Sequence, residues 1–211
     1  MALFWSNVGV DVQTALATAV SITGISKANP GVVTHGGTDP SNGDYVLLSV
    51  VGMHQVDSRI FRVANAGVGS FELEGEDTTS YETFSSGTFE VITFGSSMST
   101  AQNINVSGGE PEFSDVTTIH DNVRKRVPTI TSPMSLSFDC LYDATDAAQT
   151  EMQAAHKALS PRSIQLRFSN GTRMLFSGYV SASGVPTGQA QGVVQTRINI
   201  ESQGLPTVYS S

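Results

Sequence analysis

The sequence predicts a mainly β fold that consists of one core domain, a small separate β module and a single α-helix. Charged residues make up only 14% of the chain, well below the roughly 25% of an average soluble domain. Several short runs alternate apolar with polar residues and end at turn residues, which is typical of strands with one buried face. Residues 143–159 have helical spacing instead. A chain of 211 residues is long enough to bury such a core and an insertion.

Composition argues against several classes of protein. Cys140 is the single cysteine, so we expect neither a disulfide framework nor a cysteine-based metal site. The longest apolar stretch, residues 46–53, is far shorter than the roughly 20 residues that cross a bilayer, so no membrane anchor is expected. Because no Lys or Arg precedes Lys27, the N-terminus lacks the basic region of a secretory signal. The net charge of −8 argues against a surface that grips nucleic acid phosphates.

Residues 1–24 are predicted to form an N-terminal arm that leads into the first core strand. Val8, Val10 and Val12 alternate with other residues, and an Ala/Thr/Val/Ile run follows.

Residues 25–95 are predicted to form an inserted, acidic, all-β module. They contain nine acidic and three basic residues, and therefore hold −6 of the net charge of −8. Turn sequences such as Asn29-Pro30-Gly31 separate short β runs. The candidate strands are residues 45–51, 60–64, 70–73 and 89–94.

The remaining residues, 96–211, are predicted to form the core. They open with a long polar loop, residues 102–133, which contains the one basic cluster of the chain, Arg124-Lys125-Arg126. Loops of this length in compact domains are usually functional or disordered. The strand that follows alternates apolar residues with Ser135, Ser137 and Asp139, and so has one face in water.

Asp143 and Asp146 resemble a capping box, which predicts a helix that begins there and ends near Leu159, before Ser160-Pro161. Ala148, Met152, Ala155 and Leu159 would form its apolar stripe.

Asn170-Gly171 predicts a β-hairpin with a two-residue turn. That register pairs Leu166 with Leu175 but also Phe168 with Arg173, so the register stays open. Residues 194–201 form the last long alternating strand.

Several segments together resemble proteins of phage tails. Residues 25–34, 41–44, 52–53, 62–65 and 70–75 resemble a small β module that is inserted in many phage tail proteins. Gly109-Glu-Pro-Glu-Phe-Ser-Asp-Val-Thr-Thr118 is similar to a loop of phage tail tube proteins, and residues 178–183 and 196–207 are similar to their closing strands and Gly-x-Pro-Thr ending. These segments occur along the chain in the same order as in the family, and this order supports the resemblance.

The resemblance implies the major tail tube protein of a long, flexible-tailed phage. It implies a β-sandwich or barrel-like core with a flanking helix, and stacked rings of six subunits whose strands join into one β-barrel around a lumen. DNA would pass through this lumen into the host during ejection. The implied partners are a tape measure protein, a tail terminator and tail tip proteins. The protein would be made in the host bacterial cytoplasm and located in the virion.

Two sets of residues are candidates for this assembly. Arg124, Lys125 and Arg126, with Glu110 and Asp115 of the same loop, are expected at the contact between rings, because three adjacent cations would gain from carboxylates on a neighbouring subunit. Ser135, Ser137 and Asp139 are expected to face the lumen, where sparse negative charge lets DNA slide.

No catalytic, cofactor or metal site is expected. His35, His54, His120 and His156 lack a second ligand at metal spacing and are expected in loops or on the surface. His120-Asp121 has no nucleophile elbow to complete a hydrolase triad. The acidic run at residues 72–77 lacks the spacing of a calcium loop.

Two alternatives remain open at this stage. A tube protein of a contractile injection or secretion system would share the ring-forming core. A receptor-binding tail module would need exposed aromatic platforms, and the only tryptophan, Trp5, lies in the N-terminal arm.

Overall fold

The computed structural model describes residues 8–188 and 192–210. Residues 1–7 of the predicted N-terminal arm, with Trp5, lie outside the described residues. The described helices are α1 (Ala147–Ala158) and the short 3-10 turn η1 (His54–Val56). The strands are β1 (Gly9–Leu16), β2 (Val20–Ile25), β3 (Val32–His35), β4 (Tyr45–Val51), β5 (Ile60–Gly67), β6 (Ser70–Leu73), β7 (Ser86–Met98), β8 (Ala101–Ser107), β9 (Pro111–Asp115), β10 (Arg126–Thr131), β11 (Ser135–Leu141), β12 (Pro161–Arg167), β13 (Arg173–Ala182), β14 (Gln195–Ser202) and β15 (Thr207–Tyr209).

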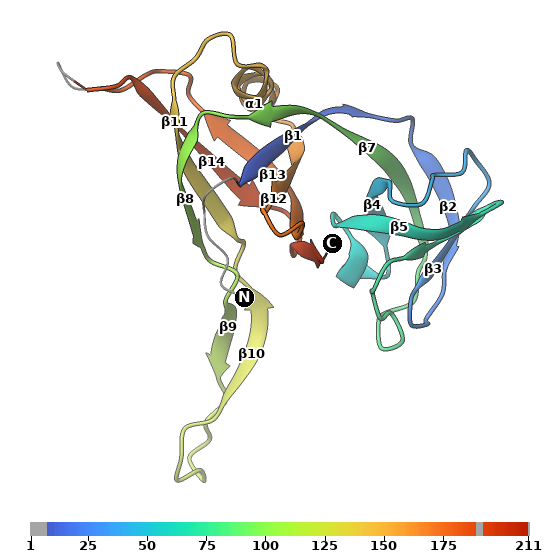
Figure 1. Ribbon diagram of the computed structural model, residues 1–211. Coiled ribbons are helices and arrows are strands. Elements are labelled where there is room, and N and C mark those ends of the chain that lie inside the picture. Colours follow the sequence, from blue (N-terminus) through green and yellow to red (C-terminus); the bar gives the residue numbers. More distant parts are fainter. Residues whose placement is uncertain (1–7, 189–191, 211) are drawn as a thin grey trace.

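Most strands belong to one long sheet with the order β2-β3-β6-β5-β4-β7-β1-β12-β13-β14-β11-β8 (Figure 1). Pairing of β2 with β7 closes the first six strands into a β-barrel, and the others form a curved open sheet. Strand β15 pairs with β13, while β9 and β10 form a separate ribbon. The predicted mainly β fold with one helix is therefore confirmed.

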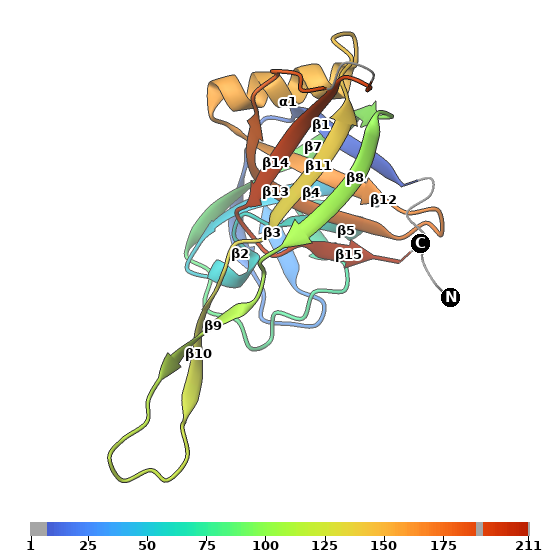
Figure 2. The ribbon, with the colours of Figure 1, turned by 90° about the vertical axis from the view of Figure 1, so that its left-hand side faces the viewer.

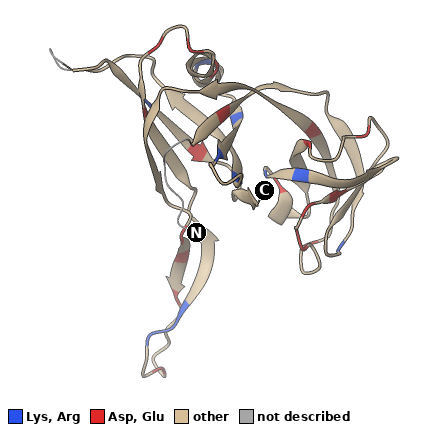
Figure 3. Ribbon diagram, viewed as in Figure 1, with Lys and Arg blue, Asp and Glu red and all other residues tan. Residues whose placement is uncertain are grey.

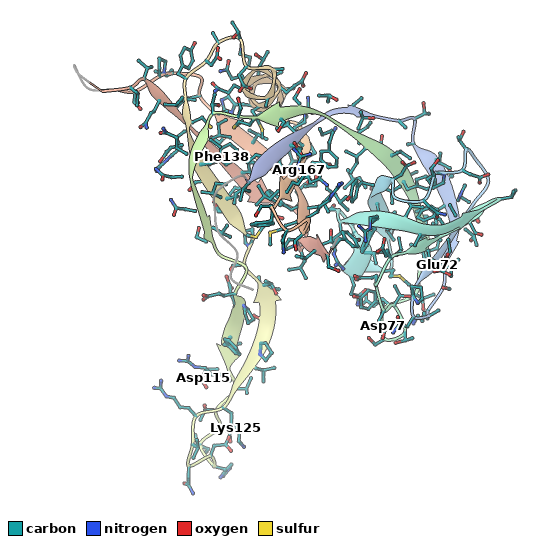
Figure 4. The ribbon with its side chains drawn as sticks, in the orientation of Figure 1. Glu72, Asp77, Asp115, Lys125, Phe138 and Arg167 are labelled. Atoms are coloured by element: carbon teal, nitrogen blue, oxygen red, sulfur yellow. The ribbon has the colours of Figure 1, made fainter. Side chains whose placement is uncertain are left out.

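Two apolar cores follow from this division. The first fills the barrel and includes Leu48, Phe61 and Phe89. The second lies between the curved sheet and α1, and includes Phe138 and Met152 (Figure 4). Helix α1 packs against β13, β7 and β1.

A third apolar cluster joins the barrel to the curved sheet. Tyr45, Ile60 and Ile92 pack there against Leu175 and Tyr209 of the C-terminal strands. The Tyr209 hydroxyl also accepts a hydrogen bond from the backbone N–H of a barrel residue, Arg62, at 2.9 Å. The C-terminal strand thus fastens the barrel to the rest of the chain.

The chain enters and leaves the barrel at one place. The backbone N–H of Ala17 donates to the carbonyl of Val91 at 2.9 Å. Strand β7 then continues without a break from the barrel into the curved sheet, where it pairs with β1.

Several predicted strands match the observed ones, and others were missed. Strands β4 and β6 have the predicted bounds, and β5 and β7 are longer than predicted. Strand β3 was not predicted. The segment at residues 102–133, predicted as an irregular loop, instead holds β8 and the β9–β10 hairpin.

The error in the 102–133 segment has a physical reason. Asn has low strand propensity, but backbone pairing with β11 holds Asn103 and Asn105 in β8. Pro128 lies in β10 opposite Phe113, in an exposed two-stranded ribbon where proline is tolerated.

The helix begins later than predicted, at Ala147 instead of Asp143. Its N-cap is Asp146, whose Oδ1 accepts a hydrogen bond from the Gln149 N–H at 3.0 Å. Asp143 instead accepts from the Thr145 N–H at 2.8 Å, in a turn before the helix. Both aspartates can cap a backbone N–H, so the motif alone could not choose between them.

The apolar stripe of the helix was only partly right. Ala148, Met152 and Ala155 are buried against the sheet. Leu159 has a left-handed backbone with φ 49° and is 78% exposed. Because this residue terminates the helix before Ser160-Pro161, its side chain leaves the buried face.

The β12–β13 hairpin has a three-residue loop, not the two-residue turn that Asn170-Gly171 suggested. Gln165 pairs with Leu175, one residue away from the ideal two-residue register. The Phe168 N–H donates to the Thr172 carbonyl at 2.9 Å and closes the loop. Gly171, with φ 88°, supplies the left-handed residue that this loop type requires.

Candidate functional surfaces

A continuous polar face covers one side of strands β8, β11, β14 and the end of β13. Residues directly opposite each other in the pairing share a face of the sheet. Ser135 pairs with Ser107 and Glu201, Ser137 with Asn105 and Asn199, and Asp139 with Asn103 and Arg197. Tyr179 and Ser181 of β13 extend the same rows. The three residues expected to face a lumen therefore lie side by side at the centre of this polar face.

This face carries little charge. The Arg197 Nε donates to Asp139 Oδ1 at 2.9 Å, and this hydrogen bond raises the pKa of the guanidinium. Glu201 is the remaining charged residue of the named rows. The face therefore has a net charge near −1 and a surface of hydroxyl and amide groups.

The other side of the same strands is apolar. Leu136, Phe138 and Cys140 of β11 are buried in the core under α1. Burial raises the pKa of the Cys140 thiol to about 12, so this cysteine is a packing residue and not a reactive thiolate. Because polar and apolar residues alternate strictly in β11, one face of this strand is polar and the other is packed against the core under α1.

Strand β8 forms one end of the sheet. Within residues 8–188 and 192–210, its only sheet partner is β11. Its outer edge consequently presents backbone N–H and C=O groups that can pair with a strand of another chain.

The β9–β10 hairpin projects away from the body of the molecule (Figure 2). Every residue of both strands is exposed. At its root, Gly108 and Gly109 have φ of 78° and 79°. A Cβ on Gly108 would lie 2.2 Å from the Pro133 carbonyl oxygen, so the close approach of the two chains there requires glycine.

The predicted contact residues are distributed along this hairpin. Arg124, Lys125 and Arg126 lie at its tip, and Figure 4 shows Lys125 and Asp115 in this region. Asp115 lies directly opposite Arg126. Glu110 lies at the root, where its carbonyl oxygen accepts a hydrogen bond from the Ser132 N–H at 3.0 Å, so it is not brought to the cluster.

Two of the three cations have carboxylates nearby in the same hairpin. Lys125 forms an ion pair with Asp121, and its hydrogen bond lowers the pKa of that carboxyl. Hydrogen bonds from Thr117 lower the pKa of Asp115, with a smaller effect from the charge of Arg126. The tip is nevertheless basic overall, because residues 116–126 contain three bases and one acid.

Sequence reasoning missed the apolar side chains of the hairpin. Ile119 is 96% exposed and Val123 is 74% exposed. The other exposed large apolar residues of this segment are Phe113, Val116, Val127 and Ile130. No alternating pattern marked these residues, because Val127 is followed directly by Pro128. Exposed apolar side chains that gather on one projecting segment are typical of interaction surfaces.

The barrel carries both acidic and basic residues (Figure 3), and several of them form ion pairs. Glu76 forms an ion pair with Arg59 at 2.5 Å, and Glu74 forms one with Arg62. Asp77 accepts from Thr79. In the described part of the chain, no three His, Cys, Asp or Glu residues are grouped so as to hold a metal ion.

His35 was expected in a loop or on the surface, and this expectation was wrong. This residue is buried in the barrel, with its ring 5.8 Å from that of Phe71 and 5.0 Å from that of Phe89. Closure of the barrel by β2 and β7, which are distant in sequence, is what buries it. His54 and His120 are exposed and His156 is half-buried.

No described helix has the length and apolar character needed to cross a membrane. A protein-family model described as "Phage tail tube protein, TTP" matches residues 51–211. This range includes the barrel strands β5, β6 and β7 and every strand that follows them in the chain. A search of curated proteins finds no match to the chain.

Proposed function

The chain belongs to the phage tail tube protein family, and on that premise we propose that it assembles into stacked rings of six subunits around a lumen through which phage DNA passes. It is a structural component of the virion tail. The long, flexible, non-contractile type of tail is part of this proposal. So is synthesis in the host cytoplasm, followed by assembly with a tape measure protein, a tail terminator and tail tip proteins.

The polar face of β8, β11 and β14 is the observation that carries the proposal. DNA has one negative charge per about 1.7 Å of helix axis. A basic lumen would bind it, whereas hydroxyl and amide groups with sparse negative charge allow it to slide. Ser135, Ser137 and Asp139 are accordingly the proposed lumen residues, together with Asn103, Asn105 and Asn199.

The open edge of β8 supports the formation of rings. An unpaired strand edge invites pairing with another chain, and a ring of copies can satisfy every such edge in a closed sheet. The polar rows of neighbouring copies would then continue around one common barrel. The apolar backing under α1 keeps this wall rigid.

Contact between rings is assigned to the β9–β10 hairpin. Its projection from the body suits a segment that reaches the next ring. Arg124, Lys125 and Arg126 remain proposed contact residues, with Asp115 and Glu110 beside them. The acidic barrel, which runs from β2 into β7 and largely coincides with the predicted insertion at residues 25–95, is proposed to face outward, away from the DNA path.

Electron microscopy of the purified protein tests this function. We expect hollow rods, and light scattering should show six-subunit rings as the smallest assembly. A protein that stays monomeric at high concentration, with no rods on the grid, would contradict the proposal.

The lumen assignment has a separate test, in which Ser137→Cys provides a thiol on the polar face. In assembled tubes it should react with a small maleimide but be protected from a large polymer-linked maleimide. Val68→Cys, at a position 98% exposed on the barrel, should react with both, and the buried Cys140 should stay silent. Equal reaction of Ser137→Cys with the large reagent would place this face outside the lumen.

A further inference from the structure

Two exposed apolar clusters lie at opposite ends of the molecule. The tip cluster consists of Val116, Ile119 and Val123 at the end of the hairpin. The apical cluster consists of Tyr142, Val185, Val193 and Val194. Tyr142 follows β11, Val185 follows the end of β13, and Val193 and Val194 come directly before β14. The hairpin and this apical region are at opposite ends in both Figure 1 and Figure 2.

Backbone hydrogen bonds hold part of the apical cluster in place. The Tyr142 N–H donates to the Val194 carbonyl at 2.9 Å. Thr187 and Gln195 exchange backbone hydrogen bonds of 2.7 and 2.8 Å. These bonds hold Val194 beside the end of β11, so its exposed side chain belongs to a formed surface.

The two ends also have opposite charge. The tip, residues 116–126, contains Asp121 and three bases, for a net charge of +2. The apical residues 142–151 contain three acids, Asp143, Asp146 and Glu151, and no base, and residues 183–194 are uncharged. Each end therefore combines exposed apolar side chains with a charge that the other end complements.

Within one copy these surfaces cannot meet, and copies side by side in a ring present them on opposite faces of that ring. A contact between two different patches of the same chain is heterologous, and it propagates without end when it does not close. We infer that the tip cluster of one subunit packs on the apical cluster of a subunit in the next ring. This inference rests on the proposed tube and identifies the surface that receives the hairpin.

The contact should depend on both apolar burial and charge. Raised salt screens the attraction between the basic tip and the apical carboxylates but does not weaken apolar burial. Tubes should therefore loosen only in part at high salt. Changing Arg124, Lys125 and Arg126 to Glu should weaken tube growth at low salt and leave rings intact.

Disulfide trapping between copies tests the inference. The full-length chain with Ile119→Cys and Val193→Cys, assembled into tubes and treated with a mild oxidant, should give a ladder of covalent oligomers on non-reducing gels. The same chain held as soluble rings should give none. Buried Cys140 adds no background, because its thiol is shielded from solvent. A second pair, Val123→Cys with Val194→Cys, tests a neighbouring position on each surface, in case the first two thiols are too far apart to form a disulfide.

The matched control combines Ile119→Cys with Val68→Cys, which places the second thiol on the barrel. Tubes that form normally but give no ladder with either apical pair would overturn the inference. So would a ladder that is equally strong with Val68→Cys. Failure of the wild-type protein to form tubes is a different result, which would contradict the proposed function itself.

Charge exchange provides an independent readout. Glu151→Lys, added to the triple Glu variant of the tip, should restore part of the lost sedimentation, because it lowers the net charge of the apical residues 142–151 from −3 to −1 and so weakens their repulsion of the acidic tip. Glu82→Lys changes the net charge of the chain equally, but on the barrel. If sedimentation recovers with both variants, or with neither, Glu151 is not part of the contact.

Discussion

Excision of the barrel is the most informative perturbation of this protein. Because the Ala17 N–H donates to the Val91 carbonyl at 2.9 Å, residues 18–91 can be replaced by about four Gly/Ser residues, the length of a common hairpin loop. If the barrel is an outward-facing insertion, the remaining chain should still form rings and tubes.

The cost to stability follows from the cluster that joins the barrel to the curved sheet. Excision removes Tyr45 and Ile60, which cover Leu175 and Tyr209. These two are 0% and 8% exposed in the intact chain. Burial of one large apolar side chain contributes about 1.5 to 3 kcal/mol, so the loss is about 3 to 6 kcal/mol. A typical domain has about 5 to 15 kcal/mol in total, and the shortened chain should fold with a reduced margin.

Urea denaturation followed by circular dichroism measures this loss, and sedimentation with electron microscopy measures assembly. A companion excision variant with Leu175→Thr and Tyr209→Thr removes the newly exposed apolar patch, so that association through this patch is not mistaken for tube formation. A shortened chain that is folded but forms neither rings nor tubes would refute the reasoning and assign the barrel to the ring contact.

Three further predictions concern stability. Asp146→Ala removes the N-cap of α1 and should lower the free energy of unfolding by about 1 kcal/mol in urea denaturation; no change would contradict the assigned cap. Phe138→Ala should cost about 3 to 5 kcal/mol, whereas Phe113→Ala on the exposed hairpin should cost less than about 0.5 kcal/mol, and equal losses would contradict the assigned burial. Burial raises the pKa of the Tyr209 phenol to about 12, so the unfolded chain loses this proton first and stability should fall between about pH 10 and 12. Thermal denaturation of Tyr209→Phe should lack this part of the decline, and an unchanged profile would exclude Tyr209 as its source.

The strands that could be predicted are those in which local pattern and environment agree. Strand β4 is a short, mostly apolar run and β6 alternates apolar with polar residues. Both lie between clear turns, so side-chain burial and turn chemistry point to the same bounds. Strand β8 could not be predicted in this way, because Asn103 and Asn105 are held by pairing with β11 and not by their own propensity. Closure of the barrel by β2 and β7 joins residues about 65 positions apart in sequence, which no local pattern records. The buried position of His35 depends on that closure.

The candidate surfaces could be predicted to a similar extent. Alternation in β11 was enough to place Ser135, Ser137 and Asp139 on one face. The neighbouring rows on β8 and β14 required the register of the sheet. The basic cluster was visible in sequence, but the carboxylate that pairs with Lys125 and the exposed Ile119 were apparent only in the folded hairpin.

The distribution of charge suits the proposed assembly, in which each subunit would lose much of its exposed surface. A charge that is desolvated without a partner is costly. In this chain, several charges are already paired within the subunit: Arg59 with Glu76, Arg62 with Glu74, Lys125 with Asp121, and Arg197 with Asp139. The surfaces assigned to ring and tube formation can therefore consist largely of hydroxyl, amide and apolar groups, which assemble at a small desolvation cost. In the proposed tube, the imbalance left between the basic hairpin tip and the acidic apical end would give the stacking of rings its direction, because two tips or two apical ends would repel each other.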